Sequence, residues 1–177
     1  VDDLNITVAD GAANAAAANG AGLTVDGAGA TFNYASTGDK WTTNKGLDVG
    51  GPLQVDEILE KATIDTTTTG TLAVDSQVQS VVFLNTNQTA NRTINFSNVD
   101  ANMAVGESMS FAVLATQGSS AYYFNAYQVD GNAVTPKWQG GSAPTAGNAS
   151  GIDVYTFTII KTASATFTVL ASVAQFA

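Results

Sequence analysis

The side chains that could carry out chemistry are few, because the chain of 177 residues contains no His and no Cys. Without them it cannot assemble a Ser-His-Asp or Cys-His nucleophilic system, a zinc site of the usual nitrogen and sulfur type, or a haem or iron-sulfur ligand set. Disulfides are excluded as well. The sequence therefore predicts no catalytic residue, no metal site and no cofactor.

Carboxylates are the remaining groups for acid–base chemistry. A glycosidase needs two of them facing each other across a cleft, about 5 to 10 Å apart. Beyond residue 61, each acid stands near an expected turn or strand end, and Asp100 and Asp130 are best explained as turn residues. Asp56, Glu57 and Glu60 could share a cation on a symmetry axis, but a solvated acidic face explains them better. We therefore expect a protein that is not an enzyme.

Aromatic side chains near a polar loop are the other group that could bind a ligand. The segment from Tyr122 to Trp138 holds three tyrosines and a tryptophan, and a loop rich in Gly and small residues follows it. Such rings can stack on sugars, and binding residues often lie on loops held by a rigid sheet. The candidate ligand-binding residues are Tyr122, Tyr123, Tyr127, Trp138, Gln139 and Asn148. The structural alternative is that Trp138 packs against Tyr127 inside the domain.

The elements that must position these residues are short strands. From Ala62 onward, segments that favour strands recur every 8 to 15 residues, and several alternate polar with apolar side chains. This alternation is typical of antiparallel sheets with one face on a core. We therefore expect an all-β fold, with an antiparallel, jelly-roll-like β-sandwich over residues 62–177. The expected strands cover 62–65, 71–74, 80–84, 93–96, 108–115, 121–129, 133–138, 152–160 and 165–172.

The same alternation predicts which side chains enter the core. Asp130-Gly131 predicts a tight hairpin, because a type I′ turn needs positive φ at both central residues. The side chains expected to face inward are Phe111, Val113, Phe157, Ile159, Phe167 and Val169. The side chains expected to face away are Ser110, Thr158 and Thr168.

Residues 1–50 are expected to form a small β module. Strands are predicted over 5–8, 23–25, 30–34 and 40–42, and the alanine-rich run 12–18 favours one or two helical turns. The large apolar groups expected to supply its core are Leu23, Val25, Phe32, Tyr34 and Trp41. A core this small seldom suffices below about 70 residues without staples or association. Because the chain has no cysteines, oligomerisation is the remaining route.

Residues 51–61 begin within Gly50-Gly51-Pro52, a sequence typical of linkers, and are expected to form a linker or a short helix. Val55, Ile58 and Leu59 stand at helical spacing, which would give an apolar stripe able to meet copies of itself. These three residues are the predicted trimer contacts. The alternative is a strand or turn that covers the end of the next domain.

The charge balance bears on partners. Six Lys and Arg stand against fifteen Asp and Glu, a formal net charge of −9. This argues against nucleic acid, which requires a basic surface, and against anionic membrane surfaces. No apolar run is long enough for a transmembrane helix and no signal peptide is evident. Since the chain opens without Met, we expect it to continue a longer polypeptide or to have been processed.

Two stretches carry a resemblance to a known group of proteins. Residues 9–41, from Ala9-Asp10-Gly11 through Asn19-Gly20 to Asp39-Lys40-Trp41, resemble a module that recurs in structural proteins and tail fibres of large marine cyanophages. The remainder resembles the terminal domain of the same proteins. Its most specific stretches are Ala121-Tyr122-Tyr123, Gln128-Val129-Asp130-Gly131, Val134-Thr135-Pro136-Lys137-Trp138-Gln139-Gly140-Gly141, Gly147-Asn148-Ala149, 152–162 and 169–172.

The resemblance implies a virion protein outside the host cell, assembled as a parallel homotrimer at the end of a tail fibre or neck appendage. Its partners would then be other copies of itself, other virion proteins and possible glycans of the host surface. Two alternatives stay open. One is a glycan-binding adhesin domain that reads cell-surface polysaccharide, and the other is a capsid or tail decoration protein.

Overall fold

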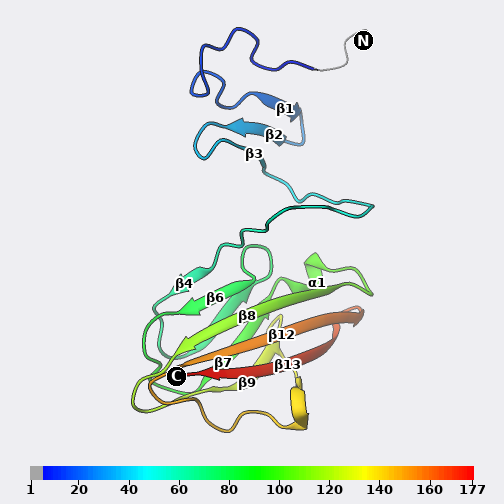
Figure 1. The fold of residues 1–177 in the computed structure, drawn as a ribbon. Helices are drawn as coiled ribbons and strands as arrows, with labels where there is room; N and C mark the ends of the chain where they lie inside the picture. The colour runs from blue at the N-terminus through cyan, green and yellow to red at the C-terminus, as the bar shows by residue number, and fades with distance from the viewer. Residues whose placement is uncertain (1–5) are drawn as a thin grey trace. The chain divides into compact units, whose positions relative to one another are not determined.

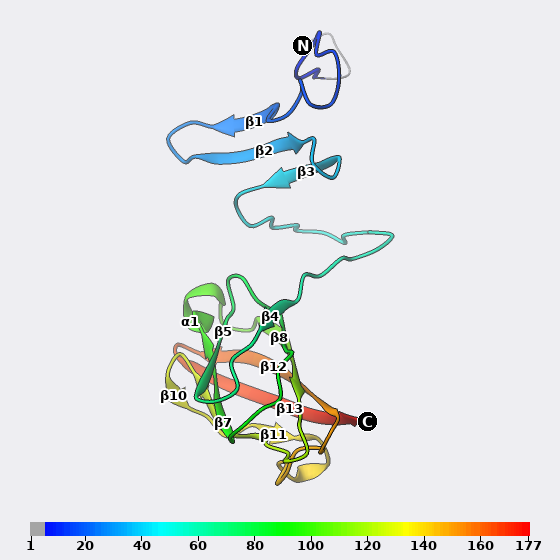
Figure 2. The same ribbon diagram turned by 90° about the vertical axis from the view of Figure 1, so that its left-hand side faces the viewer.

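A computed structural model describes residues 6–177, and the chain divides into two compact units, Val1–Glu57 and Ile58–Ala177. The boundary falls within residues 51–61, the segment expected to link the two parts. Most of the described residues that form regular structure are in strands (Figures 1 and 2). The all-β prediction is therefore confirmed.

The amino-terminal unit contains one antiparallel sheet in the order β1-β2-β3. Its strands are β1 (Gly22–Val25), β2 (Ala30–Ala35) and β3 (Lys40–Thr43), which confirms three of the predicted strands. The fourth, over residues 5–8, is wrong for Ile6 to Val8, which are not in a strand, while Asn5 lies outside the described residues.

The alanine-rich run forms turns in place of a helix. The backbone amide of Ala18 donates to the carbonyl of Asn14 at 3.1 Å, but no regular helix propagates from this turn. Residues 51–61 also contain no helix, so the helical alternative for this segment is wrong. Both results follow from the cost of helix nucleation, which runs of seven and eleven residues recover only when a packed face supports them.

The carboxy-terminal unit is built from two sheets. The four-stranded sheet has the order β10-β9-β7-β5, and the six-stranded sheet has the order β11-β13-β12-β8-β6-β4. Its strands are β4 (Thr63–Asp65), β5 (Thr71–Asp75), β6 (Val81–Leu84), β7 (Arg92–Ser97), β8 (Ser108–Thr116), β9 (Phe124–Val129), β10 (Asn132–Ala133), β11 (Lys137–Trp138), β12 (Ile152–Ala163) and β13 (Thr166–Phe176). A short helix α1 (Val99–Asn102) and a 3-10 turn η1 (Gln139–Gly141) complete the unit.

Strand pairing corrects the expected antiparallel, jelly-roll-like sandwich. Strands β4, β6 and β8 are neighbours in one sheet and pair in parallel, and so do β5, β7 and β9 in the other. Successive strands from β4 to β9 therefore alternate between the sheets, so the chain coils and each turn adds one strand to each sheet. Antiparallel pairing appears in β8–β12, β12–β13 and β9–β10.

The core lies between the two sheets and follows the predicted alternation. Phe111, Val113, Phe157, Ile159 and Val169 are buried, and Phe157 is only 1% exposed, which excludes a one-residue slip of β12. Phe167 is partly buried and packs against this core. On the opposite parity, Ser110 is exposed, and Thr158 and Thr168 have intermediate exposure. These residues lie on β8, β12 and β13, which are adjacent in Figure 1.

The predicted hairpin at Asp130-Gly131 is present. Both residues have positive φ, 49° and 78°, and Val129 pairs with Asn132 across the turn. The Asp130 carboxylate also accepts the backbone amides of Val99 and Asp100 at 3.1 and 2.8 Å. Asp130 therefore holds the start of α1 as well as forming the turn, which agrees with its prediction as a turn residue.

Candidate functional site

The six predicted ligand-binding residues do not converge on one site. Tyr122 and Tyr123 lie just before β9 and line a small cavity, whereas Tyr127 and Trp138 line a separate hollow. Gln139 opens η1, is exposed and lines a further hollow of about 390 Å³ together with Trp138, and Asn148 lies in the loop before β12. These residues are close in sequence, but the folded chain distributes them over several different places.

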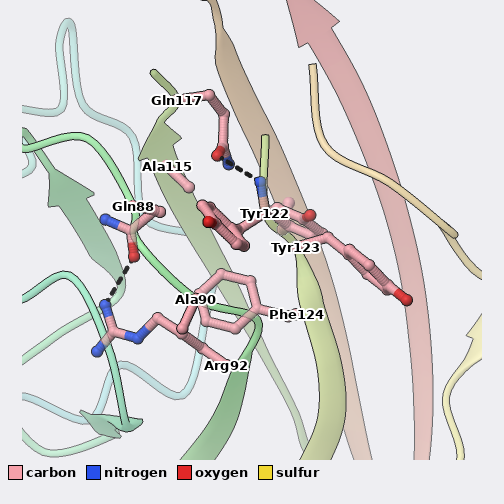
Figure 3. Close-up of a pocket in the computed structure, with 9 residues that line it drawn as sticks. Gln88, Ala90, Arg92, Ala115, Gln117, Tyr122, Tyr123 and Phe124 are labelled. Carbon is pink, nitrogen blue, oxygen red and sulfur yellow. Dashed lines mark hydrogen bonds between the residues drawn. The ribbon is translucent and has the colours of Figure 1, made fainter. Parts of the chain in front are cut away.

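The cavity beside Tyr122 and Tyr123 has a volume of about 10 Å³ (Figure 3). This is close to the roughly 10–15 Å³ that a single water molecule requires. The cavity is thus too small for a sugar ring. Its lining residues are Gln88, Ala90, Arg92, Ala115, Gln117, Tyr122, Tyr123, Phe124 and Tyr155.

Arg92 in this cavity has a structural role. Its guanidinium donates to the carbonyls of Thr67 and Gly70 at 3.0 and 3.1 Å, and to Oε1 of Gln88 at 2.9 Å, the last drawn in Figure 3. The side chain is 3% exposed, and burial lowers the pKa of its guanidinium, with Asp65 acting in the opposite direction. Its donors hold the loop between β4 and β5, so they are not available to an anion.

Tyr155 is the unusual group of the cavity. Its hydroxyl is buried and has no hydrogen-bond partner among the described residues. Burial raises the pKa of this hydroxyl, so it stays neutral at physiological pH. A buried hydroxyl without a partner costs stability.

Trp138 and Tyr127 pack against each other, as the structural alternative predicts. Their ring centroids lie 5.5 Å apart in an edge-to-face arrangement, and Trp138 also lies 6.3 Å from Phe157 of the core. The Tyr127 hydroxyl donates to the carbonyl of Phe124, and burial raises the pKa of this hydroxyl. Both aromatic rings therefore pack within the sandwich, at the place where the chain passes from β10 in one sheet to β11 in the other.

Asn148 is also held by the protein itself. Its backbone amide donates to the Asp153 carboxylate at 3.1 Å, and its side-chain amide donates to the carbonyl of Phe176 at 3.1 Å. Gln117 donates to the same carboxylate at 3.1 Å. Burial raises the pKa of Asp153, and these hydrogen bonds oppose that shift. Together they fix the loop before β12 against the ends of β8 and β13.

A hollow missed by the sequence analysis lies over these same strand ends. Thr116, Ile152 and Phe176 form a row of directly opposite residues across β8, β12 and β13. Phe176 is 58% exposed and lines a hollow of about 560 Å³. The alternation of β13 could have predicted the exposure of Phe176, because Phe176 is an even number of residues from outward-facing Leu170 and an odd number from inward-facing Val169. The predicted strand ended at residue 172 and so did not include it.

The predicted trimer contacts lie outside regular structure. Val55, Ile58 and Leu59 are 48%, 79% and 97% exposed. Their contacts with other copies remain a prediction, since a single chain does not test them.

The amino-terminal sheet presents a second apolar surface. Leu23 lies opposite Phe32, and Tyr34 lies opposite Trp41, so these side chains share one face. Phe32 and Trp41 stack with centroids 5.1 Å apart. Leu23, Phe32 and Trp41 remain 59%, 45% and 52% exposed. The alanine-rich segment borders Tyr34 and Trp41 around a hollow of about 380 Å³ and does not bury this face.

Two classes of feature are not found in residues 6–177. No group of three or more acidic side chains is close enough to hold a metal ion within this range. No helix of the same residues is long and apolar enough to span a membrane.

Together, the fold and these surfaces define a two-unit all-β protein whose predicted aromatic residues mostly serve packing. Comparisons with family models, curated proteins and solved structures find no match for the chain. Any functional conclusion therefore depends on the chain's own residues and on the resemblance of its sequence.

Proposed function

We propose that this chain is a non-enzymatic structural protein of a bacteriophage virion, the end of a trimeric tail fibre or neck appendage. The resemblance of residues 9–41 and of the carboxy-terminal stretches supports the virion assignment. The structural observation that carries the proposal is that no residue from 6 to 57 is buried.

A unit without a buried side chain lacks the main source of folding free energy. Burial of apolar surface contributes about 25 cal/mol per Å², and ordering each backbone residue costs roughly 1–2 kcal/mol. The amino-terminal unit must therefore obtain its core from elsewhere. Other copies of the same chain would supply one if their sheets met through the apolar face.

The composition of this face suits association between copies. Besides Leu23, Val25, Phe32, Tyr34 and Trp41, the same parity brings only Ala30 and Thr43 to it. No Asp, Glu, Lys or Arg occupies a strand position on this face, although residues 1–60 carry nine acids and two lysines. The charge that reaches its edge is the Asp39 carboxylate of the β2–β3 turn, which accepts the Tyr34 hydroxyl at 2.6 Å, so copies could approach through the rest of the face without opposing like charges.

Sedimentation equilibrium of the whole chain at micromolar concentration tests this proposal. We expect the mass of a trimer for the wild type and a loss of association for the double variant Leu23→Ser, Val25→Ser. Thr24→Asn is the matched control, because Thr24 lies on the opposite face of β1. A stable wild-type monomer would contradict the proposal and favour a decoration protein that docks on another virion component.

A further inference from the structure

The hollow at the end of the six-stranded sheet differs from the other aromatic sites of the carboxy-terminal unit in its exposed ring. Phe176 forms no aromatic pair among the described residues, whereas Tyr127 and Trp138 pack together. Its row with Ile152 and Thr116 forms one apolar side of the hollow. An aromatic ring that remains 58% exposed beside a concave surface is available to a ligand.

Neutral polar side chains surround this ring. Asn87, Ser119 and Ser150 line the same hollow and are exposed. Within the described chain, their side-chain atoms form no hydrogen bond to another residue. An amide and two hydroxyls therefore offer both donors and acceptors to whatever occupies the hollow.

The loops that carry these groups are held in place. The backbone amide of Gln117 donates to the carbonyl of Gly151 at 2.9 Å, and the backbone amide of Ser150 donates to the carbonyl of Gly118 at 2.8 Å. A Cβ at Gly151 would lie 2.2 Å from the carbonyl oxygen of Phe176, so only glycine permits this close approach. The hollow is thus preformed, which lowers the entropic cost of binding.

The charge of the site selects the chemistry of the ligand. No Asp, Glu, Lys or Arg side chain lines the hollow, and residues 58–177, the unit that contains it, carry seven acids against four bases. An anionic ligand would therefore find no cationic side chain in the lining to pair with, in a unit that is itself acidic. A ring with apolar C–H faces and several neutral hydroxyls matches both the Phe176 ring and its polar rim.

We propose that this hollow binds a pyranose ring of a neutral polysaccharide, with the sugar stacked on Phe176 and its hydroxyls bonded by Asn87, Ser119 and Ser150. The inference does not rest on trimerisation, because every lining residue belongs to the carboxy-terminal unit of one chain. A monomer that binds sugar would contradict the trimer and support this site, whereas a trimer that does not bind sugar would do the reverse.

Saturation-transfer NMR of the whole chain tests this site with four probes: maltohexaose, cellohexaose and laminarihexaose as neutral chains, and a hyaluronan hexasaccharide as an acidic one. We expect transfer to at least one neutral probe and none to hyaluronan. Phe176→Ala should weaken the binding by roughly tenfold, the loss expected when a stacked ring is removed. Leu170→Ala is the matched control, because Leu170 is an outward-facing, 43% exposed residue of the same strand.

The proposal is overturned if no neutral probe receives transfer, if only hyaluronan does, or if Phe176→Ala binds as the wild type does. The melting temperature of each variant is measured beside the NMR experiment, to show whether the variant is folded. If Phe176→Ala lowers the melting temperature, Asn87→Ala decides the question, because Asn87 is an exposed side chain outside the core. Weakened binding by a stably folded Asn87→Ala supports the site, and unchanged binding contradicts it.

Discussion

The ammonium of Lys161 lies 2.8 Å from Oδ1 of Asp100, and this ion pair ties α1 to β12. Lys161 also donates to the backbone carbonyls of Asp100 and Met103, both at 2.8 Å. The Asp100 carboxylate accepts the amide of Ala165 in the β12–β13 turn at 2.8 Å. Two side chains thus join α1 to the β12–β13 hairpin, although Asp100 and Lys161 are 61 residues apart in the sequence.

The pH dependence of stability should report this pair. The hydrogen bond from Lys161, followed by that from Ala165, lowers the pKa of Asp100 below its ordinary value. A lowered folded-state pKa contributes stability that is present above the ordinary Asp pKa, about 3.9, and is lost as pH falls through the folded value. We expect Asp100→Asn to unfold at lower urea than the wild type at pH 7, with the gap narrowing toward pH 2. A gap that is constant or widens in acid would contradict this role.

Truncation of Phe157 should be among the most damaging changes in the core. Its ring is 1% exposed and lies 5.0 Å from that of Phe96, across the interface between the two sheets. By comparison with other buried aromatic truncations, Phe157→Ala should cost about 3–5 kcal/mol of unfolding free energy. Urea denaturation followed by circular dichroism measures this cost, with exposed Thr156→Ala as the control. A loss below about 1 kcal/mol would be inconsistent with the packing.

Trp138 should behave as a packing residue. Because its ring contacts those of Tyr127 and Phe157, Trp138→Ala should lower the unfolding free energy by about 2–4 kcal/mol, somewhat less than a fully buried ring. The same urea titration compares it with Leu170→Ala, for which we expect a loss of under about 1 kcal/mol. An unchanged melting temperature for Trp138→Ala, together with loss of adsorption to host cells or glycans, would restore its predicted role in ligand contact.

Removing the Tyr155 hydroxyl should not harm the fold. The oxygen is buried without a hydrogen-bond partner among the described residues, so Tyr155→Phe removes a desolvated polar atom and keeps the ring. We expect a stability equal to the wild type or higher by up to about 1–3 kcal/mol. Differential scanning calorimetry gives the answer, and a clear loss of stability would show that the hydroxyl makes a favourable interaction.

Local patterns were sufficient for several features of this protein. Alternation places Phe111, Phe157 and Val169 in the core, since successive side chains of a strand point to opposite faces. Asp130-Gly131 specifies its hairpin because few other residue pairs tolerate positive φ at both positions. The absence of His and Cys excludes whole classes of chemistry without reference to any fold.

Strand pairing and the grouping of surface residues were decided by the tertiary structure. Alternation reports which face of a strand is buried but not which strand lies beside it. It therefore predicts an antiparallel sandwich where the structure has the parallel coil of β4 to β9. The helical propensity of residues 12–18 was likewise insufficient without a packed face to support it. Thr116, Ile152 and Phe176 meet only because three strands pair in one register, a long-range relationship that no local pattern encodes.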